Sequence, residues 1–99
     1  MAEIITSAVV PIWHTMTKQS IASIESQGFD QIIAVFDGVL PQPLSGTWDQ
    51  IRLSSNCGQQ RARNTGLLHA TGKYVLHVDD DTTLYPGCLA AMVEAIERT

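Results

Sequence analysis

The feature that most constrains the fold of this chain is a set of short apolar runs that do not alternate with polar residues. Such runs at residues 4–10, 32–36 and 74–78, together with a short segment at residues 51–54, are predicted to be β-strands. Strands that are apolar on both faces are typical of a parallel sheet, because helices then cover both of its sides. We expect Pro11 to close the first run, since proline cannot donate a hydrogen bond to a neighbouring strand.

Helices are predicted between these runs. Thr15 or Thr17 can cap a first helix, and Gly28 is well placed to end it. A second helix is expected after the turn at residues 56–58, and Gly72 then stops it. Each helix would therefore lie between two strands, as in a crossover connection.

A last helix is predicted near the end of the chain, where Pro86 suits its first turn. Four apolar residues share one face of this helix, at Leu89, Met92, Val93 and Ile96. The resulting order is strand, helix, strand, loop, strand, helix, strand, helix. This order predicts an α/β fold with a Rossmann-like parallel sheet of about four strands and helices on both faces. We expect residues 1–99 to form a single domain.

Composition limits the partners of the chain. The net charge of −4 argues against a general affinity for nucleic acid. No stretch approaches the roughly 18 to 20 apolar residues of a membrane span, so the chain is not expected to be transmembrane. Cys57 and Cys88 lie far apart without metal-ligand spacing, and we expect free thiols in a reducing compartment. A cytoplasmic location is the default expectation.

Three consecutive acids, Asp79, Asp80 and Asp81, follow directly after the last apolar run. Adjacent carboxylates repel one another and resist desolvation, so a stabilising group is expected beside them. A divalent cation would serve, because hard oxygen ligands suit Mg²⁺ or Mn²⁺. An alternative is that the acids, with the two threonines that follow, only open a loop and cap the next helix.

Other polar groups are predicted at the same edge of the sheet. Residues 11–14 follow the first strand, and Asp37 with Gly38 follows the second. The carboxyl ends of parallel strands share one edge, where open α/β sheets bind ligands. Residues 58–64 lie at a predicted helix start, where backbone N–H groups and guanidinium groups suit anions. Together these groups predict a crevice for a metal-bound phosphate.

In this order, the motifs resemble those of family 2 glycosyltransferases with the GT-A fold. The matching segments are Pro11 with Trp13, Asp37-Gly38, Asn56-Cys57-Gly58, Ala62-Arg63-Asn64, Gly72-Lys73-Tyr74, Asp79-Asp80-Asp81 and Pro86. The resemblance covers nearly the whole chain and implies the N-terminal, nucleotide-sugar-binding half of that fold. It also implies a nucleoside-diphosphate sugar as donor, with UDP-sugars favoured, and Mn²⁺ or Mg²⁺ as cofactor.

The resemblance implies a role for each matching acid. Asp37 resembles the acid that contacts the nucleotide base or ribose, and Arg63 resembles the arginine that borders the base and diphosphate. Asp79 and Asp81 resemble the outer acids of an Asp-x-Asp motif and are the implied metal ligands. Asp79 also belongs to the implied nucleotide-binding set, as does Asp80, which resembles a middle residue that faces the ribose or sugar.

Pro11 and Trp13 complete the implied nucleotide-binding set. Trp13 is expected either to stack on the base or to pack in the core. Here the chain departs from the family pattern, because Ile12-Trp13-His14 replaces the usual Thr-Tyr-Asn. Phe36 also replaces the first acid of the usual Asp-Asp pair, so the resemblance is weakest where the base would bind.

The resemblance implies that an acceptor-binding half, with its carboxylate base, follows the part of the family represented here. We therefore assign no catalytic residue, expect a truncated domain that is inactive alone, and leave open whether the chain itself is an enzyme. The alternative is a non-catalytic nucleotide-binding or protein-interaction module. An uncovered sheet edge and helix face would favour a homo-oligomer or a partner chain.

Overall fold

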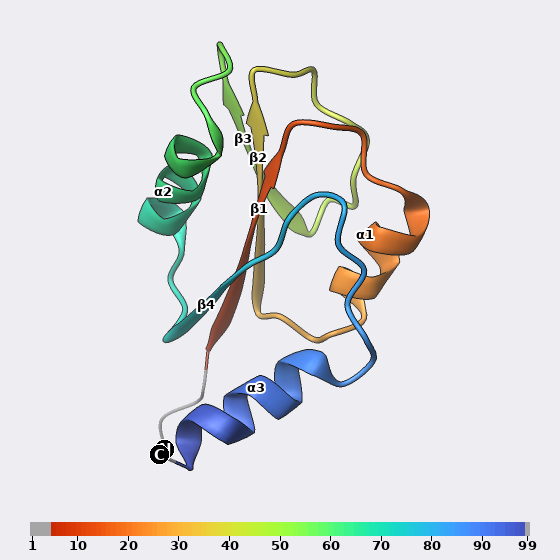
Figure 1. Ribbon diagram of the computed structural model, residues 1–99, viewed down its shortest axis with the longest axis vertical. Helices are drawn as coiled ribbons and strands as arrows, with labels where there is room; N and C mark the ends of the chain where they lie inside the picture. The colour runs from red at the N-terminus through yellow and green to blue at the C-terminus, as the bar shows by residue number, and fades with distance from the viewer. Residues whose placement is uncertain (1–4, 99) are drawn as a thin grey trace.

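A single parallel sheet organises the molecule, in a computed structural model that describes residues 5–98 (Figure 1). Its strands are β1 (Thr6–Ile12), β2 (Gln31–Asp37), β3 (Trp48–Leu53) and β4 (Tyr74–His77). The order across the sheet is β3-β2-β1-β4, and every neighbouring pair is parallel. The predicted α/β fold with a Rossmann-like parallel sheet is confirmed.

In the part of the chain that the structure describes, three helices accompany the sheet: α1 (Lys18–Glu25), α2 (Gln59–His69) and α3 (Cys88–Glu97). Figure 1 shows α1 and α2 on opposite sides of the sheet, as predicted, with α3 toward the amino-terminal ends of the strands. Within residues 5–98, no helix combines the length and the apolar character needed to cross a membrane.

The prediction that Pro11 closes the first strand is wrong, because β1 continues through Pro11 to Ile12. The carbonyl of Val9 accepts a hydrogen bond of 2.9 Å from the N–H of Val78, on the side of β4. Backbone groups of alternate residues face the same neighbouring strand, so the nitrogen of Pro11 faces that side too, beyond the last residue of β4. The missing N–H therefore interrupts no ladder between paired strands. Ile4, which the prediction included, lies outside the described residues.

The boundaries of α1 follow the local signals of the sequence, whereas α2 ends at His69, before Gly72, and α3 begins later than predicted. Thr17, one of the two predicted caps, accepts a hydrogen bond of 3.1 Å from the N–H of Ser20 at the start of α1. Gly28 follows that helix with a φ of 87°, a conformation that favours glycine. Pro86 precedes the last helix instead of lying in its first turn, because α3 begins only at Cys88.

The core has two layers, one on each face of the sheet. The buried cluster on the α1 side comprises Ala8, Val10, Ile12, Met16, Ile24, Ile32, Ala34, Phe36, Trp48 and Val78. The cluster on the α2 side comprises Val9, Ile33, Val35 and Ala62. Successive residues of β1 and β2 thus enter opposite layers, which explains why these strands are continuously apolar.

Helix α2 packs on the sheet through its small residues. Ala62 and Gly66 are buried, whereas Leu67 is 47% exposed and Leu68 is 86% exposed. A β-carbon at Gly66 would lie 2.3 Å from Cγ1 of Val9, which is closer than atoms in contact can approach. Glycine at this position therefore sets how closely α2 approaches the sheet.

Helix α3 buries little of its apolar face. Leu89 is 8% exposed, but Met92 is 41% exposed and Ile96 is 48% exposed. The end of the helix is held to the start of β4, because the hydroxyl of Tyr74 donates a hydrogen bond to Glu97. The apolar spacing correctly predicted a helix, but of the four apolar residues that define this spacing only Leu89 is buried.

Candidate functional site

A hollow of about 450 Å³ opens at the sheet edge where β1, β2 and β4 end. Six of the residues singled out from the sequence line it: Pro11, Trp13, Asp37, Asp79, Asp80 and Asp81. They come from three strand ends that are far apart in sequence, and the parallel register brings them together. Arg63 does not line the hollow, but it contacts one of the acids that do.

Asp37 and Gly38 fix the end of β2 against the loop that leads into α2. The side chain of Asp37 is buried, and its Oδ1 accepts a hydrogen bond of 3.0 Å from the N–H of Cys57. Gly38 has a φ of 74°, and a β-carbon there would lie 2.3 Å from the backbone nitrogen of Asn56. The structure therefore explains why aspartate and glycine stand at these two positions without any contact to a ligand. The carboxylate supports the wall of the hollow from within.

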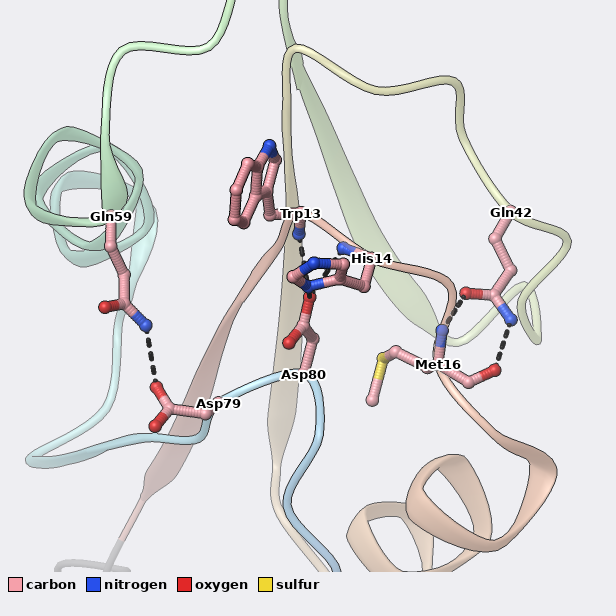
Figure 2. A network of polar contacts seen from close by, with 7 residues as sticks. All are labelled: Trp13, His14, Met16, Gln42, Gln59, Asp79 and Asp80. Carbon is pink, nitrogen blue, oxygen red and sulfur yellow. Dashed lines mark hydrogen bonds and ion pairs between the residues drawn. The ribbon is translucent and has the colours of Figure 1, made fainter.

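Asp79 contacts helix α2. Its Oδ1 accepts hydrogen bonds from Nε2 of Gln59 at 2.9 Å and from Nη2 of Arg63 at 3.1 Å (Figure 2 shows the contact with Gln59). The Asp79 side chain is 49% exposed, so its contact with Arg63 is a partly solvated ion pair. Within residues 5–98, Nε of Arg63 is buried and has no hydrogen-bond partner. A buried donor without a partner stands beside the acid that was predicted to hold a metal.

Asp80 contacts the loop that follows β1. Its Oδ2 accepts hydrogen bonds from the consecutive N–H groups of Trp13 and His14, each at 2.8 Å (Figure 2). The same oxygen lies 3.7 Å from Nδ1 of His14. The side chain of Asp80 is only 12% exposed, so this acid is much less open to solvent than its neighbour Asp79. This link between two loops could not be predicted from the sequence.

Asp81 is exposed at the rim of the hollow. The alternative in which the acids cap the next helix is wrong, because the N-cap of α3 is Gly87 and no side chain caps the helix. The first acid does open a turn, since the carbonyl of Asp79 accepts a hydrogen bond of 3.1 Å from the N–H of Thr82. The triplet therefore starts a loop, but it has no capping role.

The donor set suits a hard divalent cation. The carboxylates of Asp79 and Asp81 both line the hollow, and Mg²⁺ commonly binds through one or two carboxylates together with substrate phosphates. In the described part of the chain, no three His, Cys, Asp or Glu side chains are grouped to hold a metal by themselves. A cation held by these two carboxylates would therefore need further ligands, such as the oxygens of a bound phosphate.

Trp13 is 58% exposed, so the expectation that it packs in the core is wrong. Its ring meets the ring of His14 edge-on, with centroids 4.6 Å apart. Both residues also line a second hollow of about 450 Å³, together with Phe36 and Leu40. Trp13 and His14 therefore form a wall between two hollows.

Sequence reasoning missed the role of Gln59, which lines the main hollow and contacts Asp79. Its position at a helix start was the only available signal, and many helix starts carry a polar residue. Asn56 also lines the hollow, and its Oδ1 accepts a hydrogen bond of 3.1 Å from the N–H of Gly58. From the sequence, Asn56 could be identified only as part of the Asn56-Cys57-Gly58 motif.

Cys57 and Cys88 are both free thiols, as predicted.

Comparison with known proteins agrees with this architecture. Residues 7–99 match the profile described as glycosyl transferase family 2. A search of curated proteins returns no significant match. Because the family match spans nearly the whole chain and the sheet has the Rossmann-like form of a GT-A half, this chain belongs to glycosyl transferase family 2.

Proposed function

We propose that the main hollow binds a nucleoside-diphosphate sugar, preferably a UDP-sugar, as the donor for transfer of the sugar to an acceptor. The observation that carries the proposal is the meeting of Asp37, Asp79, Asp80 and Asp81 around one hollow at the carboxyl edge of the sheet. Open α/β sheets bind ligands at this edge. Membership of glycosyl transferase family 2 supplies the chemical class.

The proposed contacts follow the position of each residue. Pro11, Trp13 and Asp37 line the part of the hollow assigned to the nucleotide, and Asp80 belongs to the same wall. Arg63 borders the nucleotide from α2. No residue of this chain is assigned as the catalytic base on the acceptor.

Asp79 and Asp81 are the proposed ligands of a divalent cation, Mn²⁺ or Mg²⁺. When bound, such a cation stabilises negative charge on the departing nucleoside diphosphate as a Lewis acid. Before the donor binds, Arg63 and Gln59 occupy Oδ1 of Asp79. The guanidinium of Arg63 is suited to phosphate oxygens, and it has a buried Nε without a partner in the described part of the chain. When the cation binds the carboxylate of Asp79, we expect the Arg63 side chain to leave this carboxylate and to contact the diphosphate.

Calorimetric titration with UDP tests the proposal. The wild type is titrated once with Mn²⁺ and once with EDTA, and we expect binding only with Mn²⁺. Asp79→Ala/Asp81→Ala should abolish this binding, because it removes both proposed cation ligands.

The matched control is Asp49→Ala/Glu94→Ala, which also removes two carboxylates but leaves the hollow intact. Asp49 lies near the amino end of β3, and Glu94 lies on α3 with Arg98 as its partner. This control should bind UDP as the wild type does. Equal UDP binding with Mn²⁺ and with EDTA would contradict the proposed role of the cation, and no binding to any nucleoside diphosphate would contradict the proposed function.

A second candidate function is that of an interaction module formed with a second copy of the chain. The specific observation is the exposure of Met92 and Ile96 on one face of α3, together with the short edge strand β4. Light scattering at high protein concentration tests this candidate. An oligomer that Met92→Glu dissociates would support this candidate, and a monodisperse monomer of the wild type would exclude it.

The two free thiols, Cys57 and Cys88, suit a reducing compartment. A cytoplasmic location is part of the proposal.

A further inference from the structure

The three acids of the triplet have different surroundings. Asp79 contacts α2, Asp81 is exposed at the rim, and Asp80 alone contacts the loop after β1. Asp80 is also much less exposed than Asp79, with 12% against 49% of the side chain open to solvent. This difference sets the middle acid apart from the two proposed cation ligands.

The two N–H groups that donate hydrogen bonds to Asp80 belong to residues whose side chains are exposed. Trp13 is 58% exposed, and the side chain of His14 is 68% exposed, so neither is held by burial in the core. The two hydrogen bonds of 2.8 Å have a charged acceptor, which makes them stronger than bonds between neutral groups. The two hydrogen bonds to Asp80 therefore hold the backbone of Trp13 and His14 in position relative to β4.

The two residues held in this way form the wall between the main hollow and its neighbour. A shift of the loop would move the Trp13 ring and change the shape of both hollows. The same oxygen of Asp80 accepts both bonds, so that oxygen is already engaged before any ligand arrives. This engagement differs from the direct contact with ribose that the family resemblance implies.

We propose that Asp80 is a positioning residue: its carboxylate holds the backbone of Trp13 and His14 in place and so shapes the wall against which the donor nucleotide binds. The effect on nucleotide binding rests on the proposed function. The hold on the loop does not, because it is a property of the protein without ligand.

Amide hydrogen exchange measured by NMR tests the hold on the loop. The amide protons of Trp13 and His14 should exchange at least about tenfold faster in Asp80→Ala than in the wild type, which corresponds to the loss of a charge-assisted hydrogen bond. In Asp80→Asn the remaining carbonyl oxygen can still accept both bonds, so exchange should lie closer to the wild-type rate. Asp81→Ala is the matched control and should leave both amides unchanged.

Equal exchange in Asp80→Ala and the wild type would overturn the proposal. If Asp80→Ala does not fold, the wild type alone decides. Its two amides should then exchange at least about tenfold more slowly than in an unstructured peptide of the same sequence. Unprotected amides in the folded wild type would also overturn it.

UDP titration in the presence of Mn²⁺ tests the consequence for the ligand. Asp80→Ala should weaken binding by about tenfold, while Asp80→Asn should keep most of the affinity because it keeps the hydrogen bonds. If Asp80→Asn loses as much affinity as Asp80→Ala while its two amides stay protected, Asp80 contacts the ligand by its charge and the positioning role is wrong. If the wild type binds no nucleotide, the proposed function fails and the amide exchange still decides whether Asp80 holds the loop.

Discussion

At the scale of single residues, close packing explains features that a motif alone does not. Gly66 lies where α2 meets β1 and β2, and a β-carbon there would lie 2.3 Å from Cγ1 of Val9 and 3.2 Å from Cγ2 of Val35. Both valine side chains are fully buried and have no free space to move into. The glycine is therefore needed for packing.

Gly66→Ala should lower the free energy of unfolding by about 1–3 kcal/mol, as is usual when a well-packed core is overfilled. The gain in helix propensity from alanine, about 1 kcal/mol, offsets this loss only in part. Urea unfolding followed by circular dichroism measures the difference. Gly46→Ala is the control, because nothing lies within 4 Å of the added carbon, and it should stay within about 0.5 kcal/mol of the wild type. A stabilising effect of Gly66→Ala would show that α2 sits farther from the sheet.

At the scale of elements, α3 is the least firmly packed of the three helices. Leu89 anchors its start in the core with 8% exposure, whereas Met92, one turn later, is 41% exposed. Leu89→Ala should cost about 2 kcal/mol of unfolding free energy, and Met92→Ala less than about 1 kcal/mol. Urea unfolding of the two variants checks this order. Equal losses would mean that Met92 is buried in solution, as the interaction with a second copy would require.

The stability of the last turn of α3 is expected to depend on pH, because a small cluster of polar side chains on the surface holds it to β4. The hydroxyl of Tyr74 donates to Glu97, and Nζ of Lys73 lies 3.5 Å from the same carboxylate. The hydrogen bond from Tyr74, with help from the charge of Lys73, lowers the pKa of Glu97 below its ordinary value of 4.5. A lowered pKa stabilises the folded state above pH 4.5, and this contribution is lost as the pH falls through the lowered value.

We therefore expect the amide protons in the last turn of α3 to lose protection as the pH falls below about 4.5. Glu97→Gln should remove this pH dependence, because it has no carboxylate to protonate. Glu94→Gln is the matched control on the same helix and should keep it, although it breaks the pair with Arg98. Hydrogen exchange measured across the acid range checks both. Unchanged pH dependence in Glu97→Gln would exclude the cluster as its source.

At the scale of the whole molecule, a ligand at the carboxyl edge would contact three strand ends at once. Binding to the folded state alone stabilises it, by about 2.7 kcal/mol when the ligand concentration is a hundred times Kd. For a chain of 99 residues this corresponds to a rise in Tm of roughly 10 °C or more. Thermal unfolding with UDP and Mn²⁺ should show this rise, and UDP with EDTA should not. A Tm that is the same in both conditions would contradict cation-dependent binding of UDP by the folded chain.

Much of the fold could be predicted from the sequence because its signals are local. Continuously apolar runs predicted strands that are covered on both faces, and Thr17 and Gly28 marked the ends of α1. The extent of β1 could not be predicted, because Pro11 is tolerated there only since its nitrogen faces a side on which β4 has already ended. That condition depends on the register between β1 and β4, which no local pattern contains.

The sequence by itself determined the α/β class, the parallel sheet and the edge at which the polar residues gather. It could do so because apolar periodicity and the direction of crossover connections leave few arrangements. Only the tertiary structure decided what each acid contacts: Asp37 the loop before α2, Asp79 that helix, and Asp80 the loop after β1. Asp79 and Asp80 are adjacent and alike in sequence, but their carboxylates contact different segments. The partner of each of these two acids is therefore fixed by the segment that the sheet brings alongside it.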